Sequence, residues 1–314
     1  MVKLDLLSID ALKSTLTAFN PSIDPQKPFD SLQAYLDFYS LPIPSEQISL
    51  CTGNISVNQK SVFVCAWQPP KPRGTALVVH GYLDHLGLYR HLINHLIDKN
   101  LAVVCFDLPG HGLSDGQAAF IEDFADYTAV LEALIDLCQQ YYPAPFHGFG
   151  QSTGGAILLK HLLAEQHSKD YPLASLNLFA PLLHPTAWWL NRRLLPLIKP
   201  FRKSFVRHFG HSSQDREFVD FLCHKDLLQA TSIPIPWLLA ADKWAREFER
   251  CEGNDFPVNI IQGDADKTLN WKYNMRTFKQ KLPNMNLQMI KSANHHMVNE
   301  CQSLRTEIFN CIKL

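Results

Sequence analysis

The chain has 314 residues, of which 46% are hydrophobic and 19% are charged, an ordinary composition for a globular protein with a sizeable core. The formal net charge of −1 gives no support for nucleic acid or another polyanion as a partner. Because no uncharged apolar run approaches the roughly 20 residues that span a bilayer, and the N-terminus lacks the features of a signal peptide, we expect a cytoplasmic protein.

Residues 1–45 are predicted to form an N-terminal helical extension that becomes rich in proline toward its end. From about residue 47 the hydrophobic pattern changes to the period of strands. Residues 48–57 and 61–67 flank an Asn-Gln-Lys turn, which indicates an antiparallel pair.

Strands and helices then alternate along the chain. Unbroken apolar runs such as TALVVH are typical of parallel strands that are covered on both faces. The alternation predicts an α/β fold with a mostly parallel central sheet and helices on both of its faces. Strands are expected at 75–80, 101–106, 146–149, 173–183, 258–262 and 287–290, and helices at 89–99, 121–142, 154–166, 271–281 and after residue 300.

Residues 184–252 interrupt this alternation with aromatic, basic and proline-punctuated helical sequence. We therefore expect a core made of 46–183 and 253–314, with 184–252 inserted as a cap or lid.

Eight cysteines are scattered along the chain, without a CxxC pair or a Cys/His cluster at zinc-site spacing. We expect reduced thiols and no bound metal, and a single disulfide stays an open alternative.

The pentapeptide Gly150-Gln151-Ser152-Thr153-Gly154 fits the pattern G-x-S-x-G. It follows a predicted strand and opens a predicted helix, which is the setting that a nucleophile elbow requires. The glycines relieve collisions in the tight turn, and the N-terminal end of the helix favours negative charge at the serine. We expect Ser152 to be the nucleophile; the alternative is a glycine-rich turn with an incidental serine.

Two flanking segments carry a resemblance to a known family. HGYLDHLGLY at 80–89 resembles the HGxxEHxxxY stretch of the monoacylglycerol lipase and lysophospholipase family, with Asp84 in place of the usual glutamate. DLPGHGLSDG at 107–116 resembles that family's DxxGHGxSxG loop, to which we assign no catalytic residue. The match covers about 50–180 and 257–302, and it implies a serine esterase of the α/β-hydrolase fold that needs no metal or organic cofactor.

The loop that ends the first parallel strand can present a backbone N–H to the site. The N–H groups of Tyr82 and Thr153 are expected to form the oxyanion hole, a role that does not depend on their side chains.

In this fold the acid and the base follow the serine in that order. The segment QGDAD follows a strand and offers two aspartates, and the family's spacing implies Asp266, with Asp264 as the alternative. The segment SANHH resembles the family's GAxH element, which implies His295 as the base, with His296 as the alternative and Ser292 in place of the usual glycine.

The expected substrate is a lipid-like carboxylic ester, a monoacylglycerol or a lysophospholipid. A small-ester carboxylesterase, a peptidase or an acyltransferase on the same scaffold stays open, because the triad does not distinguish them. A non-catalytic binding module is disfavoured because a candidate for every catalytic part is present. A haloalkane dehalogenase is disfavoured because position 152 is serine rather than aspartate.

The insertion combines apolar and basic side chains, with no acidic residue between His184 and Ser213. This pattern suits peripheral contact with an anionic membrane surface. Pro196 and Pro200 interrupt any long amphipathic helix, which favours instead a cap packed on the core with a solvated basic face. The apolar residues are Trp188, Trp189, Leu190, Leu194, Leu195, Leu197, Ile198, Phe201 and Phe205, and the basic ones are Arg192, Arg193, Lys199, Arg202, Lys203 and Arg207.

Overall fold

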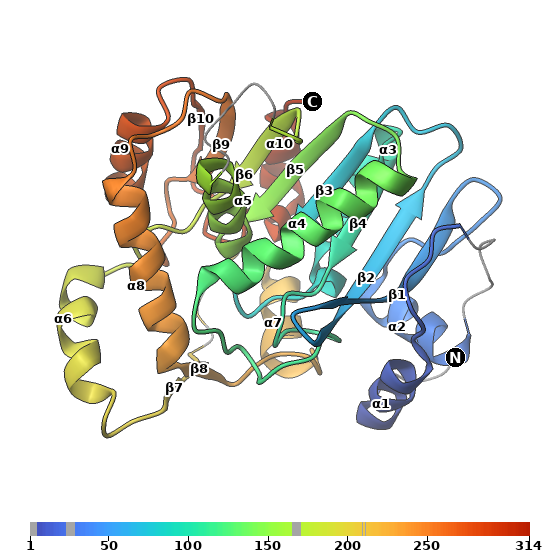
Figure 1. Cartoon of the computed structure of the whole chain (residues 1–314), viewed down its shortest axis with the longest axis horizontal. Coiled ribbons are helices and arrows are strands. Elements are labelled where there is room, and N and C mark those ends of the chain that lie inside the picture. Colours follow the sequence, from blue (N-terminus) through green and yellow to red (C-terminus); the bar gives the residue numbers. More distant parts are fainter. Residues whose placement is uncertain (1–4, 23–28, 165–170, 209, 211) are drawn as a thin grey trace.

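A computed structural model describes residues 5–22, 29–164, 171–208, 210 and 212–314. Eight strands form one sheet (Figure 1), in which β2 runs antiparallel to both of its neighbours. The strands β4, β3, β5, β6, β9 and β10 are parallel to one another. The predicted α/β fold is confirmed. In spatial order the strands are β1 (Ser49–Val57), β2 (Lys60–Gln68), β4 (Ala102–Phe106), β3 (Thr75–Val79), β5 (Phe146–Gln151), β6 (Ser175–Phe179), β9 (Val258–Gly263) and β10 (Asn286–Ile290).

Helices cover both faces of the sheet (Figure 1) because successive side chains of each strand point to opposite sides. On one face pack α4 (Phe124–Tyr141), α5 (Thr153–Ala164), α8 (Ile235–Arg250) and α9 (Trp271–Lys281). On the other face pack α1 (Leu6–Thr15), α2 (Asp30–Tyr39), α3 (Arg90–Asp98), α7 (Arg216–His224) and α10 (Gln302–Asn310). Strand β2 shows the alternation, with Val62, Val64 and Ala66 in the first core and Phe63, Cys65 and Trp67 in the second.

Some helices and strands have other bounds than the sequence predicted, because tertiary contacts end the element earlier. The strand predicted at 173–183 leaves the sheet after Phe179, because Ala180 has a positive φ of 44° and Leu182 N–H donates to the carbonyl of Ser152. The helix predicted at 89–99 is preceded by a 3₁₀ turn, η1 (Leu86–Tyr89). Residues 165–166 of the helix predicted at 154–166 lie outside the described residues.

Segment 184–252 lies between β6 and β9, which are neighbours in the sheet. Besides α7 and α8 it contains α6 (Trp188–Ile198) and the antiparallel pair β7 (Ser204–Val206) and β8 (Ser232–Pro234). Helix α8 also belongs to the first core, because Trp244 and Phe248 are buried there.

The described part of the N-terminal extension packs on the second core. Leu12, Tyr35 and Leu36 have no exposed surface, and residue Ala18 makes a strand-like bridge to Asn54. The remaining residues expected there, 1–4 and 23–28, lie outside the described residues.

All eight cysteines fall within the described residues, and they are free thiols. In the same part of the chain no helix combines the length and apolar character needed to cross a membrane. No group of three His, Cys, Asp or Glu side chains is arranged there to hold a metal ion.

Candidate active site

Ser152 lies in the tight turn between β5 and α5, with a left-handed φ of 52°. The turn requires glycine on both sides of it. A Cβ atom at Gly150 would lie 2.6 Å from the backbone of Gly154 and Gly155, and one at Gly154 would lie 2.0 Å from the carbonyl oxygen of Val79. The elbow therefore forms because these positions lack side chains, and it places the serine hydroxyl at the start of a helix.

Three predicted side chains meet at the carboxyl edge of the sheet. Nε2 of His295 lies 3.0 Å from Oγ of Ser152, and Nδ1 of His295 lies 2.8 Å from Oδ2 of Asp266. The three residues follow β5, β9 and β10, and parallel strands end at the same edge. The carbonyl of His295 accepts a hydrogen bond from Nε2 of Gln151, which ties the histidine loop to the elbow.

Hydrogen bonds and charge favour an ionised Asp266. Its carboxylate accepts bonds from the N–H groups of Thr268 and Leu269 at 2.8 and 3.0 Å, and from Nε2 of Gln262 at 3.1 Å. Burial raises the pKa of Asp266, but His295 and these bonds outweigh burial and lower that pKa below its ordinary value. Burial lowers the pKa of His295, and the facing Asp266 more than offsets it, so the pKa of His295 is raised.

The two alternative residues occupy different places. Asp264 is exposed, and its carboxylate accepts the N–H of Ser292 at 2.6 Å, which braces the loop before the histidines. No hydrogen bond joins His296 to Ser152 among the described residues, and Nε2 of His296 lies 3.1 Å from Oδ2 of the buried Asp84. Ser292 has a φ of 64°, a conformation that suits the glycine usual at this position.

The loop that carries Tyr82 is held close to the elbow. The N–H of Gly81 donates to the hydroxyl of Tyr89 at 2.8 Å, and that hydroxyl donates to Asp84 at 2.9 Å. A Cβ atom at Gly81 would lie 3.5 Å from Cβ of Ser152. The N–H groups of Tyr82 and Thr153 donate to no acceptor among the described residues, so both can bind an oxyanion.

Loop 107–116 contacts residues 80–86, which form the loop that carries Tyr82 and is named the oxyanion loop after its expected role. The buried carboxylate of Asp107 accepts the N–H of Leu86 at 2.7 Å and that of Leu113 at 2.8 Å. Nε2 of His80 accepts the N–H of Leu108 at 2.8 Å. The contacts of its carboxylate explain why the loop contains Asp107, a residue that makes no hydrogen bond to Ser152 among the described residues.

A buried ion pair that the sequence did not reveal joins the oxyanion loop to segment 184–252. Nε2 of His85 lies 3.0 Å from Oδ2 of Asp226, and both side chains have no exposed surface. The hydroxyl of Tyr39, on α2, donates to the same carboxylate at 2.8 Å. Burial lowers the pKa of His85, but Asp226 outweighs burial, so the pKa of His85 is raised. Burial raises the pKa of Asp226, but His85 outweighs burial, so the pKa of Asp226 is lowered. The signal in the sequence was His85 itself, which lies within the HGYLDHLGLY segment.

A cavity of about 760 Å³ opens at Ser152 and His295. Its size falls in the range of small-molecule sites. Apolar side chains from segment 184–252 and from the core line much of it, namely Leu182, Pro185, Val219, Leu222, Ile233, Trp237, Leu238 and Leu269. Such walls suit an acyl chain.

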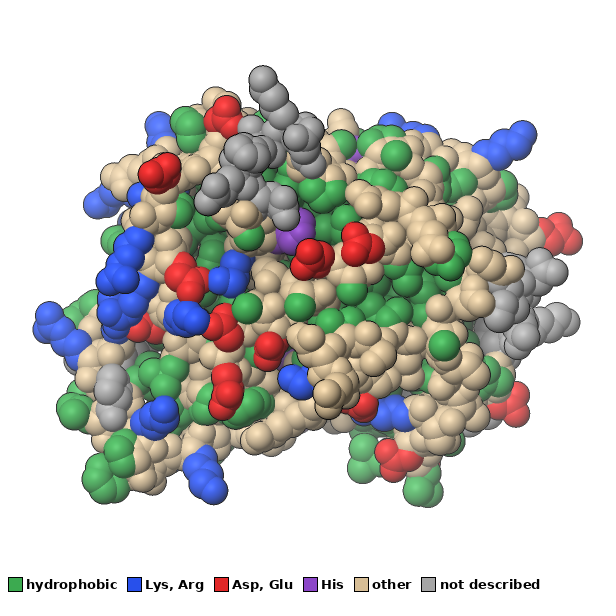
Figure 2. All heavy atoms as spheres, in the orientation of Figure 1, with side chains coloured by type: hydrophobic (Ala, Val, Ile, Leu, Met, Phe, Trp, Pro, Cys, Tyr) green, Lys and Arg blue, Asp and Glu red, His purple; other side chains and the backbone are tan. Residues whose placement is uncertain are grey.

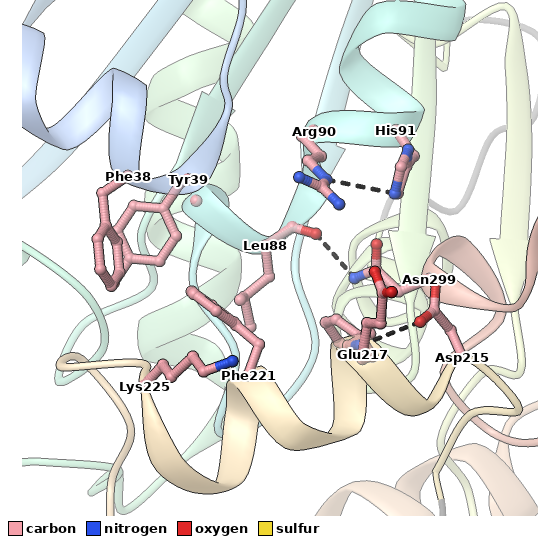
Figure 3. Close-up of a pocket in the computed structure, with 12 residues that line it drawn as sticks. Phe38, Tyr39, Leu88, Arg90, His91, Asp215, Glu217, Phe221, Lys225 and Asn299 are labelled. Atoms are coloured by element: carbon pink, nitrogen blue, oxygen red, sulfur yellow. Dashed lines mark hydrogen bonds between the residues drawn. The ribbon is translucent and has the colours of Figure 1, made fainter.

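A second, smaller hollow of about 250 Å³ lies between α2, η1 and α7. Figure 3 shows Phe38 and Tyr39 on one side of it and Phe221 and Lys225 across from them. No residue of the Ser152 site other than the supporting Tyr39 lines this hollow. The chemistry therefore belongs to the larger cavity.

Comparison with known proteins gives a consistent result. The family model described as Hydrolase_4, serine aminopeptidase S33, matches residues 70–302. The chain is similar to the monoglyceride lipase of Homo sapiens, with 30% identity over 270 residues, which cover 83% of this chain and 88% of that protein. It is also 30% identical to the monoacylglycerol lipase of Mycolicibacterium smegmatis, over 97 residues that cover 30% of this chain and only 35% of that protein.

Among solved structures, the fold is similar to that of a soluble variant of the monoglyceride lipase from Saccharomyces cerevisiae in complex with a substrate analog. The TM-score is 0.70 at 18% identity, and the match covers 82% of this chain and 91% of that one. This likeness shows the fold.

Proposed function

The chain belongs to the serine aminopeptidase S33 family and is a serine hydrolase of the α/β-hydrolase fold, and we propose that it cleaves monoacylglycerols or lysophospholipids with Ser152, Asp266 and His295 as its triad. One observation supports this proposal above the others. The hydrogen-bonded series from Asp266 through His295 to Ser152 ends in a large, mainly apolar cavity.

The geometry supports the following sequence of steps. His295 takes the proton of Ser152 as Oγ attacks the ester carbonyl, and Asp266 orients the imidazole and stabilises its charged form. The N–H groups of Tyr82 and Thr153 bind the oxyanion. The alcohol leaves with the proton from His295, and an acyl-enzyme remains. Water then gives a proton to His295 and attacks the acyl carbon. The bond between that carbon and Oγ breaks, His295 returns the proton to Oγ, and the fatty acid leaves.

The proposed substrate class follows from the walls of the cavity and from the relatives. Apolar side chains line much of the cavity, and burial of each CH₂ group of an acyl chain contributes about 0.8 kcal/mol. The two relatives described above are monoacylglycerol lipases by name.

We also propose that segment 184–252 contacts a membrane surface. Trp189, Leu197 and Phe201 are 67%, 69% and 89% exposed. In Figure 2 hydrophobic and basic side chains gather at the end of the molecule where Figure 1 places α6. Other side chains of α6, among them Trp188 and Leu195, are buried, so one part of the helix packs on the protein while another faces outward.

Ser152→Ala tests the proposed function directly. A fluorophosphonate probe is expected to label the wild type and not the variant, and turnover of monoacylglycerol is expected to fall by about 10⁴–10⁶. A panel of monoacylglycerols, lysophospholipids, short p-nitrophenyl esters and an aminoacyl anilide then ranks the substrate classes by kcat/KM. Full activity of the variant, or a clear preference for the anilide, would reject the proposal.

A further inference from the structure

The side chain of Tyr82 stacks on Trp237, at the start of α8. The two ring centroids are 3.5 Å apart and the ring planes differ by 10°. Tyr82 belongs to the oxyanion loop of the core, whereas Trp237 belongs to segment 184–252. The stack therefore joins the loop that would bind the oxyanion to the segment that covers the cavity.

Further contacts fix the position of the Tyr82 ring. Its hydroxyl donates to the carbonyl of Ala119 at 2.8 Å, and its ring packs edge-on against His111 with the centroids 5.6 Å apart. Trp237 is only 5% exposed, and its ring also lies near Phe124 of α4. A ring that is stacked on one face, contacted at its edge and hydrogen-bonded at its tip has little freedom to move aside.

Both rings line the same cavity as Ser152. The ring of Tyr82 and the N–H that would bind the oxyanion are carried by one residue. An ester oxygen bound to that N–H would thus lie within about 5 Å of Cβ of Tyr82, from ordinary bond lengths and hydrogen-bond distances. The substituents of the reacting carbonyl must therefore pass close to this pair of rings.

We propose that Tyr82 and Trp237 form an aromatic wall that determines specificity, admitting esters whose acyl chain is unbranched beside the carbonyl and excluding those branched at that carbon. This inference rests on the proposed function, because it concerns the same reaction. The backbone N–H of Tyr82 serves the chemistry, and its side chain selects the substrate. A branch would require the rings to separate, which costs packing that a linear chain leaves intact.

Two isomeric esters, p-nitrophenyl octanoate and p-nitrophenyl 2-ethylhexanoate, test the wall because they differ in branching and not in carbon number. The measured quantity is the ratio of kcat/KM for the branched ester to that for the linear one. Tyr82→Ala keeps the N–H and removes the ring, so we expect this ratio to rise by about 10-fold or more. Tyr82→Phe keeps the stack, and its ratio is expected to stay within about threefold of the wild-type value.

Trp237→Ala provides a second variant that opens the wall from the other side, and it is expected to raise the same ratio. Trp244→Ala is the matched control, since Trp244 is a buried tryptophan of the same helix that does not line the cavity. A merely structural role predicts lower stability and no gain on the branched ester.

The proposed wall is rejected if the ratio stays at the wild-type value in Tyr82→Ala or in Trp237→Ala, provided that the variant folds. It is also rejected if Trp244→Ala raises the ratio by the same amount. Failure of the wild type to hydrolyse the linear ester would overturn the proposed function, and the wall with it. Hydrolysis of the linear ester by the wild type together with an unchanged ratio separates the two ideas, because only the wall is then rejected.

Discussion

Gly154 lies so close to the end of β3 that a Cβ atom there would stand 2.0 Å from the carbonyl oxygen of Val79 and 2.8 Å from that of His80. Both neighbours are backbone atoms at the end of a central strand, so they cannot rotate aside. We expect Gly154→Ala to reduce the free energy of unfolding by about 3 kcal/mol or more, measured by urea denaturation.

Gly210 provides the matched control, because a Cβ atom there would lie within 4 Å of no atom in the part of the chain that the structure describes. Gly210→Ala is expected to change the free energy of unfolding by no more than about 0.5 kcal/mol. Equal stability of the two variants would contradict the geometry of the elbow.

The charge of Asp266 controls both the orientation and the pKa of His295. Because the carboxylate raises that pKa above the ordinary 6.5, and only neutral imidazole can accept the serine proton, activity is expected to rise with pH through a pKa above 6.5. Asp266→Asn removes this charge, so kcat should fall by about 10⁴ and the acidic limb of the remaining activity should move to lower pH.

Profiles of kcat/KM against pH for the wild type and for two variants test this assignment. Asp264→Asn retains an oxygen that can accept the N–H of Ser292, and we expect it to keep the acidic limb of the wild type. The opposite result, with the limb moved by Asp264→Asn and not by Asp266→Asn, would exchange the roles of the two aspartates.

At the residue level the strand ends in the sequence pointed to the serine, to two aspartates and to two histidines, and only the family resemblance implied Asp266 and His295 among them. The sequence could not tell which of His295 and His296 contacts Ser152, because adjacent side chains point in different directions. A contact that is distant in the sequence decides which histidine binds elsewhere. That contact is Asp84, more than 200 residues earlier in the chain. Asp226 was missed for the same reason, because its partner His85 is 141 residues away and its own surroundings in the sequence carry no motif.

Among the elements, η1, α2 and the start of the loop after α7 meet at the buried carboxylate of Asp226, which binds His85 and Tyr39. Asp226→Ala would leave a buried imidazole and hydroxyl without their partner. We expect it to reduce the free energy of unfolding by about 3–5 kcal/mol. The exposed Asp220→Ala, which removes an ion pair at the surface of α7, should have a far smaller effect.

The pH dependence of this difference has a definite sign. The pKa of Asp226 is lowered from 3.8, so its contribution is present above that value and is lost as pH falls. The pKa of His85 is raised from 6.5, so its contribution is present below that value and is lost as pH rises. The difference in unfolding free energy between wild type and Asp226→Ala should thus be largest between pH 3.8 and 6.5. A difference that does not vary with pH would mean that the pair is not ionic.

The sequence predicted the parallel strands well because each is a short apolar run that must be buried on both faces. It predicted the end of β6 poorly, because residues 180–183 are equally apolar and leave the sheet only to pack beside the elbow. Hydrophobicity records that a residue is buried, whereas hydrogen bonding to the neighbouring strand decides whether it belongs to the sheet.

For the molecule as a whole, segment 184–252 connects two strands that are neighbours in the sheet. Strands β6 and β9 pair directly, so the sheet and the triad do not depend on the length of segment 184–252. The segment is nevertheless joined to the core, since α8 carries Trp237 to the oxyanion loop and Nε1 of Trp244 donates to the carbonyl of Leu182. The proposed catalysis and the proposed substrate choice therefore meet at Tyr82, which carries the proposed oxyanion N–H and contacts segment 184–252 through its ring.

The exposed face around α6 gives the last prediction. Trp189, Leu197 and Phe201 expose apolar surface beside Arg193 and Lys199, and no acidic residue occurs between 184 and 213. The apolar side chains can insert into a membrane, and the basic ones are attracted to anionic lipid. The protein should therefore bind vesicles of phosphatidylglycerol more tightly than vesicles of phosphatidylcholine, and added salt should weaken the binding. Cosedimentation with vesicles measures both effects.

Replacing Trp189, Leu197 and Phe201 together by serine should reduce partition onto phosphatidylglycerol vesicles by about 100-fold or more, because each large apolar side chain contributes on the order of 1–2 kcal/mol when it leaves water. The matched control replaces Leu6 and Leu7, which are 64% and 79% exposed on α1 at a different site. If α6 is the docking surface, the control keeps the wild-type partition and its salt dependence. Equal losses in the two variants would show that exposed apolar surface alone, wherever it lies, drives the protein onto the vesicle.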